Sequence, residues 1–182
     1  MIATALTIFA FAIFTMTNTQ STGSAQAPVA PAHVSNSFQF LVRAPLGSAA
    51  TLFGPDGERS WAGEDWNPQF LHPQPGKDIQ GAVFTVQQGR HKSVWINTVF
   101  DVAGGRMQYV SFVPDTRVSM VDVRLTSVDP SATSVEVTYV RTALDASAND
   151  EVQALGQSDR KKGPHWQEAI ETYLREQRDK TH

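Results

Sequence analysis

The sequence contains no cysteine, so neither a disulfide framework nor a lipid-modified N-terminal cysteine is available to it. It also lacks the Gly-x-Ser-x-Gly, phosphate-loop and dinucleotide-binding signatures of common enzyme classes. Its five histidines show no His-x-x-His or His-x-x-x-His spacing, so we expect no metal site and no cofactor. The net charge of −3 gives no sign of a nucleic-acid partner.

Charge is also absent from the first part of the chain, where no Asp, Glu, Lys or Arg precedes Arg43. Ile2 to Met16 is apolar apart from three threonines, and small residues follow at Gly23 to Ala25. An apolar run followed by small residues resembles a secretory signal. We therefore expect an exported protein, periplasmic or secreted, that is cleaved after Ala25.

This interpretation divides the chain into residues 1–25 as signal peptide, 26–36 as a disordered lead-in and 37–180 as one folded domain. The alternative for the first segment is an uncleaved N-terminal anchor. Its apolar run is shorter than the roughly 20 residues that a membrane-spanning helix needs. Such an anchor is the only membrane contact that we expect, and the oligomeric state is left open.

The clearest secondary-structure signal is an alternation of apolar and charged residues between 119 and 125. Val121, Val123 and Leu125 alternate with Asp122 and Arg124, as in a strand with one face buried and the other in water. A shorter strand is expected at 37–42, and five more segments separated by short turns are expected at 81–86, 93–100, 107–113, 118–128 and 133–142. Such short connections leave no room for crossover helices, so the sheet is antiparallel.

The C-terminal part has helical periodicity instead. Trp166, Ile170 and Leu174 share one stripe, as in a helix that lies with one side on a core. The Gly163-Pro164 pair is expected to break or kink this helical region, because proline lacks the interior hydrogen-bond donor. We expect this helix to cover the apolar face of the sheet, which makes an α+β fold.

The segment from Glu58 to Pro75 is irregular and carries two of the four tryptophans, Trp61 and Trp66. So much aromatic surface in a loop has to be buried. Two interpretations are open for these side chains: they plug the end of the core, or they form the wall of a pocket.

Four segments together resemble a known family. They are residues 52–61 (LFGPDGERSW), 66–68 (WNP), 81–84 (GAVF) and 139–144 (YVRTAL). They look like the motifs of bacterial SRPBCC-type proteins, in the superfamily of START, Bet v 1 and polyketide cyclase domains. The resemblance implies a helix-grip fold, in which a curved antiparallel sheet of six to seven strands wraps around a C-terminal helix and leaves an apolar pocket.

The candidate ligand-binding residues are those expected around such a pocket: Glu58, Trp61, Trp66, Phe84, Trp95, Tyr109, Tyr139, Arg141 and Trp166. Glu58 has two interpretations. It is either a polar or acid–base group at the pocket, with a pKa raised by desolvation, or a structural group that caps a loop or pairs with Arg141. Trp95 and Asn97 share one strand face, and the sequence leaves open whether that face points inward.

Three functions from different classes follow. The first is binding or carriage of a small hydrophobic molecule, which needs no catalytic group. The second is an enzyme of cyclase or hydratase type that uses Glu58 or Tyr139 to move protons. The third is an exported protein-interaction module without a ligand. A desolvated carboxylate hydrogen-bonded to a hydroxyl would favour the enzyme, and a cavity too small for a ligand would favour the module.

Overall fold

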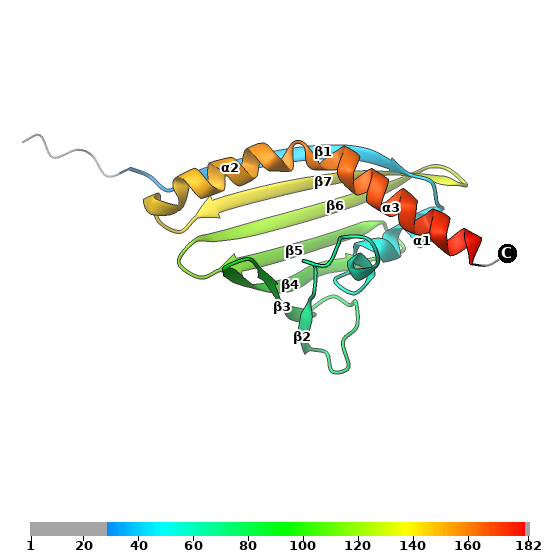
Figure 1. The fold of residues 1–182 in the computed structure, drawn as a ribbon, viewed down its shortest axis with the longest axis horizontal. Coiled ribbons are helices and arrows are strands. Elements are labelled where there is room, and N and C mark those ends of the chain that lie inside the picture. Colours follow the sequence, from blue (N-terminus) through cyan, green and yellow to red (C-terminus); the bar gives the residue numbers. More distant parts are fainter. Residues whose placement is uncertain (1–28, 181–182) are drawn as a thin grey trace, which may run out of the picture.

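The computed structural model describes residues 29–180, which form one seven-stranded antiparallel sheet with helices on one face (Figure 1). The strand order is β1-β7-β6-β5-β4-β3-β2. The strands are β1 (His33–Val42), β2 (Gln69–His72), β3 (Val83–Gln88), β4 (His91–Asp101), β5 (Arg106–Val113), β6 (Arg117–Asp129) and β7 (Ala132–Ala143). This is the expected helix-grip fold, and it confirms the predicted α+β class.

The alternation along β6 divides the sheet into an inner and an outer face as expected. Val121 and Val123 are buried in the core on the inner face. Asp122 lies on the outer face, where the side chains of Arg106, Gln108 and Arg124 donate hydrogen bonds to it at 2.9–3.1 Å. These bonds replace the hydrogen bonds to water that the buried Asp122 carboxylate loses on folding.

Two strand predictions need correction. β1 begins at His33, four residues before the expected start, so residues 33–36 belong to the sheet and not to the lead-in. Their backbone pairs with the end of β7, where His33 lies opposite Thr142. β2 was not among the predicted strands, because it is a short edge strand whose side chains are mostly exposed and show no alternation. The expected signal peptide and its cleavage site lie outside the described residues.

Two helices, α2 (Asn149–Asp159) and α3 (Lys162–Asp179), follow the sheet, and Figure 1 shows them running along its β1 side. α2 lies against β1 and β7, and α3 lies against β1. The break falls at residues 160–161, before the predicted Gly163-Pro164 pair. Pro164 lies in the first turn of α3, where backbone N–H groups have no helical acceptor and proline is tolerated. Within residues 29–180 no helix is both long and apolar enough to cross a bilayer.

The core fills the inner face of the sheet beneath α3. Ile170 is completely buried, and the Trp166 ring lies edge-on to the rings of Phe38 and Trp61 at centroid distances of 5.3 and 5.1 Å. These contacts place the apolar stripe of α3 on the sheet, as the helical spacing predicted.

Short helical segments cover the other end of the inner face. They are α1 (Leu46–Ala50), η1 (Thr51–Phe53) and η2 (Gly57–Ser60), while η3 (Ala146–Ala148) joins β7 to α2. Phe53 and Leu52 are buried against the core. The loop between η2 and β2 then brings residues 61–66 towards the inner face.

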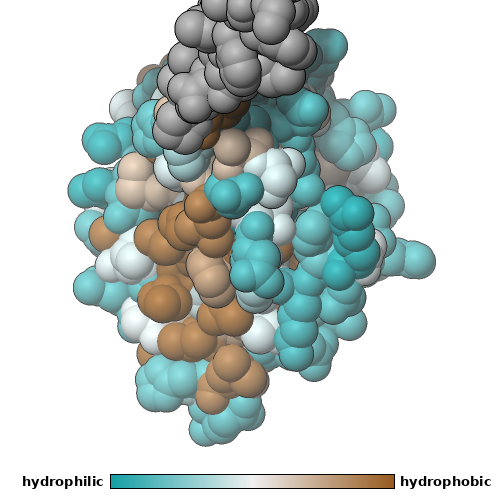
Figure 2. All heavy atoms as spheres, turned by 90° about the vertical axis from the view of Figure 1, so that its left-hand side faces the viewer, coloured by the Kyte–Doolittle hydropathy of each residue, from teal (hydrophilic) through white to brown (hydrophobic). Residues whose placement is uncertain are grey.

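The outer face of the sheet is not uniformly polar. Ile96, Phe112 and Met120 point outward from β4, β5 and β6 and are 37–43% exposed. They are neighbours across the sheet, because Val110 faces both Ile96 and Met120 and the Phe112 position adjoins Val110. Figure 2 shows a band of apolar side chains on one side of the molecule.

Candidate ligand-binding site

A cavity of about 230 Å³ lies between the inner face of the sheet, the α2–α3 region and the loop after η2. Its volume equals that of seven or eight liquid waters at about 30 Å³ each, which is enough room for a small organic molecule. It is lined by Glu58, Ala62, Asp65, Trp66, Gln88, Ser93, Trp95, Tyr109, Ser111, Val113, Arg117, Val121, Val123, Tyr139, Arg141, Leu155, Lys162 and Trp166.

The strand register arranges the lining in rows across the sheet. One row joins Tyr109, Val121 and Tyr139 on β5, β6 and β7. Two residues further along β5, Ser111 lies opposite Trp95. A third row pairs Val113 with Arg117. Successive rows are about 7 Å apart at the strand rise of 3.3 Å per residue, so the lining changes from phenolic to cationic along the strands.

Tryptophans supply the apolar walls. Trp95 points inward from β4, so the strand face that carries Trp95 and Asn97 is the inner one. The Nε1 of Trp95 donates to the Ser93 hydroxyl at 2.7 Å. The Trp66 ring stands edge-on to Trp95 at a centroid distance of 5.5 Å. Trp166 contributes a third wall from α3. Asn97, on the same strand face as Trp95, is fully buried and donates to the Ile79 carbonyl at 3.2 Å.

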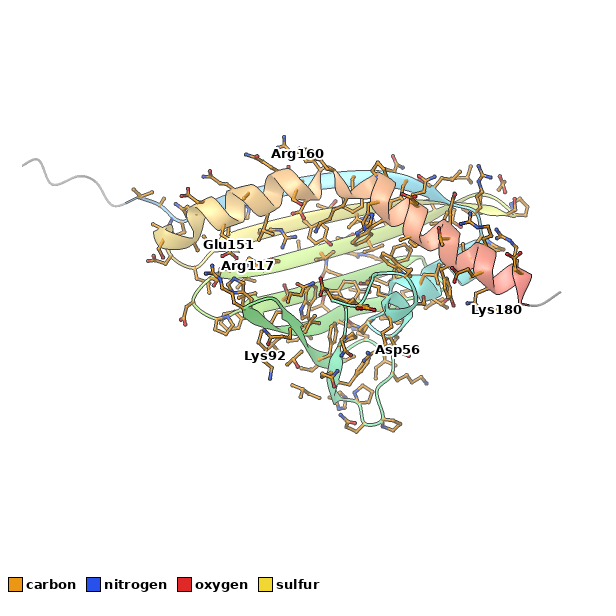
Figure 3. The ribbon with its side chains drawn as sticks, in the orientation of Figure 1. Asp56, Lys92, Arg117, Glu151, Arg160 and Lys180 are labelled. Carbon is orange, nitrogen blue, oxygen red and sulfur yellow. The ribbon has the colours of Figure 1, made fainter. Side chains whose placement is uncertain are left out.

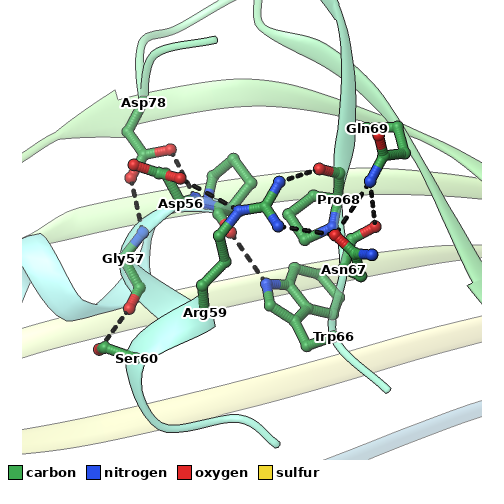
Figure 4. Close-up of polar contacts among 10 residues, drawn as sticks. Asp56, Gly57, Arg59, Ser60, Trp66, Asn67, Pro68, Gln69 and Asp78 are labelled. Carbon is green, nitrogen blue, oxygen red and sulfur yellow. Dashed lines mark hydrogen bonds and ion pairs between the residues drawn. The ribbon is translucent and has the colours of Figure 1, made fainter. Parts of the chain in front are cut away.

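Hydrogen bonds within the irregular loop fix Trp66 in place (Figure 4). Its Nε1 donates to the carbonyl of Pro55 at 2.9 Å. The Arg59 guanidinium donates to Asp56, to Asn67 and to the Pro68 carbonyl, and so bridges both ends of the loop. The loop therefore presents Trp66 to the cavity without regular secondary structure.

The two tryptophans of the irregular segment have different roles: one forms the wall of the cavity and the other plugs the core. Trp66 lines the cavity, whereas Trp61 is buried in the core and donates from Nε1 to the Leu52 carbonyl at 2.8 Å. Phe84 is also absent from the lining. It is completely buried and stacks behind Trp95 at 6.0 Å between ring centroids. The structure therefore brings seven of the nine predicted site residues to one cavity and leaves Trp61 and Phe84 in the core.

Glu58 reaches the cavity from η2 and is 9% exposed. No hydrogen bond or ion pair joins its carboxyl group to another residue within 29–180, and Arg141 pairs with Asp159 instead, so the alternative in which Glu58 pairs with Arg141 is wrong. Burial raises the pKa of Glu58 from 4.5 to about 8, and the charge of Asp78 adds to the shift. The side chain is therefore a neutral carboxylic acid at neutral pH and offers a hydroxyl donor.

Two tyrosines present further donors. Burial raises the pKa of both Tyr109 and Tyr139 above the ordinary value, so both hydroxyls stay protonated. The Tyr109 hydroxyl is buried and has no hydrogen-bond partner among the described residues. A buried polar group without a partner costs about 1–3 kcal/mol, which a ligand oxygen would recover.

Arg141 pairs with Asp159 at the end of α2, not with Glu58. Its Nε and Nη2 donate to the two carboxylate oxygens at 2.7 and 2.8 Å, and its Nη1 donates to the Ser119 hydroxyl at 3.1 Å. Burial on its own would raise the pKa of Asp159, but the hydrogen bonds and charges of Arg141 and Lys162 lower it overall. This bidentate pair fastens α2 to β7.

Two more cations line the cavity. Lys162, in the first turn of α3, lies 2.9 Å from Asp159 and has its Nζ 4.5 Å above the Tyr139 ring. Arg117, at the start of β6, forms an ion pair with Glu151 of α2, and Figure 3 shows the two side chains meeting between strand and helix. In the described part of the chain, no group of three or more His, Asp or Glu side chains is placed to hold a metal ion.

Several residues that line the cavity were not predicted from the sequence, chiefly Ser111, Arg117 and Lys162. Arg117 has the same strand parity as Val121 and Val123, which was the signal available for it. Ser111 has the same parity as Tyr109 on β5. Lys162 had no such signal, because its position depends on where the helical region breaks.

The sequence matches no protein-family model and no curated protein. Solved structures do share the fold. Norcoclaurine synthase from Thalictrum flavum, in complex with dopamine and hydroxybenzaldehyde, aligns with a TM-score of 0.58 and 10% identity over 81% of this chain and 89% of its own. Ara h 8.0201 aligns with a TM-score of 0.54 and 13% identity over 79% of this chain and 98% of its own.

An uncharacterised protein from Rhizobium leguminosarum aligns similarly, with a TM-score of 0.57 and 13% identity over 80% of this chain and 97% of its own. Identities this low establish the fold alone. The shared fold is the helix-grip fold that the sequence resemblance implies. It assigns no particular ligand, because one fold carries many functions.

Proposed function

We propose that this protein binds a small, largely apolar molecule that carries a hydrogen-bond acceptor oxygen. The observation that supports this most directly is a cavity with aromatic walls in which polar groups lack protein partners. Trp66, Trp95 and Trp166 supply flat apolar surface. The Glu58 carboxyl and the Tyr109 hydroxyl supply donors, which suit a carbonyl or ether oxygen.

Naphthalene-2-carboxamide, a neutral bicyclic molecule with one carbonyl, tests the proposal by isothermal titration calorimetry at pH 7. We expect saturable binding of one molecule per chain. Val121→Phe should abolish it, because Val121 lies between the two tyrosines in the wall of the cavity. Val110→Phe makes the same change on the outer face of β5 and should leave binding intact. Absence of binding, or equal binding by Val121→Phe, would contradict the proposal.

Trp66→Ala tests whether Trp66 contacts the ligand or only stabilises the fold. Removing an aromatic wall should weaken amide binding about tenfold or more, since an aromatic contact and its buried area are worth over 1.4 kcal/mol. Its melting temperature should fall less than that of Trp61→Ala, because Trp61 lies in the core and Trp66 is only half-buried. Unchanged affinity in Trp66→Ala would exclude a ligand wall there.

An enzyme of cyclase or hydratase type is the second candidate, and the desolvated Glu58 favours it. A pKa of about 8 suits a general acid or base near neutral pH. No hydrogen bond joins Glu58 to the hydroxyl of Tyr109 or Tyr139 in the described chain, however, and this ranks binding first. Turnover of a bound ligand that stops in Glu58→Gln, with affinity unchanged, would reverse the ranking.

We also propose that the protein is exported, on the sequence of its first 25 residues alone. Intact mass measurement of the protein from its own host tests this. A chain that begins at Gln26 supports export with cleavage, and a chain that retains Ile2–Met16 indicates an uncleaved anchor or no export.

A further inference from the structure

The cationic side of the cavity carries an excess of positive charge. Arg117, Arg141 and Lys162 all line it. Two carboxylates, those of Glu151 and Asp159, form ion pairs with these three cations. Three cations against two anions leave one positive charge without a partner of its own.

Arg117 is the cation with free donors. One of its terminal nitrogens donates to Glu151, but its Nε is buried and has no hydrogen-bond partner within residues 29–180. Glu151 is also shared, because Arg90 and His91 each lie 3.5 Å from it. A guanidinium presents five N–H donors in a plane that matches an oxyanion. Arg117, 12% exposed in its side chain, therefore retains both charge and donors for a ligand.

Lys162 and Ser111 extend this donor set. Asp159 already accepts two hydrogen bonds from Arg141, so Lys162 shares its carboxylate with a stronger partner. Ser111 is buried and lines the same part of the cavity, so its hydroxyl adds a donor beside Arg117. Asp65 lines the cavity too, but it is exposed, so water screens its charge.

We propose that the ligand carries one carboxylate or other singly charged oxyanion, which Arg117 binds with Lys162 and Ser111 beside it. This inference rests on the proposed function and narrows it to an amphipathic anion. The row of Tyr109 and the row of Arg117 are four residues apart, about 13 Å along the strands. The apolar body of the ligand spans that distance, with its acceptor oxygen at the tyrosines.

Naphthalene-2-carboxylate places a charged oxyanion where its amide has a neutral group on the same apolar body, so comparing their affinities by calorimetry at pH 7 tests the proposal. The carboxylate should bind at least tenfold more tightly than the amide, since a hydrogen bond to a charged group is stronger than one to a neutral group. Arg117→Gln should remove that preference, so that the carboxylate and the amide bind with similar affinity. Arg117→Lys should retain part of it. Arg124→Gln, on the outer face of the same strand, is the control and should keep the full preference.

The anion site can also be tested on the unaltered protein, in case the Arg117 variants fold poorly. Raising the salt from about 0.1 M to 1 M should weaken carboxylate binding several-fold and leave amide binding unchanged. Equal affinities for the carboxylate and the amide would overturn the anion site while leaving the proposed function standing. A preference that survives Arg117→Gln would overturn the role of Arg117. Failure of both molecules to bind would contradict the proposed function itself.

Discussion

Glu58→Gln should stabilise the protein at neutral pH, although it replaces a buried native side chain. The folded-state pKa of Glu58 is about 8 against 4.5 for an exposed carboxyl. Below pH 4.5 the carboxyl is protonated in both folded and unfolded chains, so it contributes no pH dependence. Between pH 4.5 and 8 the unfolded chain releases the proton and the folded chain keeps it. The unfolded state then binds fewer protons, and stability falls as pH rises.

The magnitude follows from the shift. Each pH unit in this window lowers the free energy of unfolding by about 1.4 kcal/mol. At pH 7 the native protein is therefore less stable, by about 3 kcal/mol, than a variant with a neutral side chain of the same shape. For a domain of this size that difference corresponds to about 6–12 °C in melting temperature. Glutamine supplies such a side chain, because its amide resembles the protonated carboxyl.

Urea unfolding of both proteins between pH 4 and 9 measures the effect. The two curves should coincide near pH 4.5 and separate progressively up to pH 8. Glu64→Gln, on an exposed position of the same loop, is the matched control and should follow the native curve. Parallel curves for Glu58→Gln and the native protein would refute a desolvated, unpaired carboxyl in the cavity.

Two further predictions concern the scaffold. Asp159→Ala should lower the free energy of unfolding, measured with urea, by about 3–5 kcal/mol, because it leaves the buried Arg141 unpaired. Gln157→Ala, on the exposed face of α2, is the control and should change it by less than about 0.5 kcal/mol. Similar losses in the two variants would refute a stabilising Arg141–Asp159 ion pair. Gly57→Ala should lower the melting temperature, since the added Cβ would lie 2.1 Å from the Thr51 carbonyl oxygen. Gly47→Ala, in α1, should raise it, because the added Cβ meets nothing within 4 Å and alanine favours the helix. A higher melting temperature in both variants would contradict the packing of η2.

The sheet was predictable because its alternation is a local property of the sequence. Val121 and Val123 alternate with charges that the outer face keeps in water or in ion pairs, so a period of two identified the strand and its buried face. β2 was missed for the converse reason. Phe70 and Leu71 lie on an edge strand with little burial, which leaves no periodic signal.

The candidate site was predictable only in part. Tyr139 and Arg141 share the parity of the buried valines of β7, which is the sequence signal for the inner face, and both are buried in the structure. The ion-pair partner of Arg141 could not be predicted from the sequence, because Asp159 lies on a helix whose position against β7 depends on tertiary packing. Trp61 and Trp66 lie five residues apart in one irregular segment, and it is the tertiary structure that separates them: their indole N–H groups bond to different carbonyls, those of Leu52 and Pro55, and only Trp66 lines the cavity.

The four tryptophan indole N–H groups give the most direct test of ligand binding in the cavity. Three of these side chains line it, and Trp61 does not. In ¹⁵N-labelled protein titrated with naphthalene-2-carboxamide, the indole signals of Trp66, Trp95 and Trp166 should move together and saturate at one equivalent, with a smaller change at Trp61. If all four signals stay in place, or Trp61 alone moves, the cavity is not a binding site.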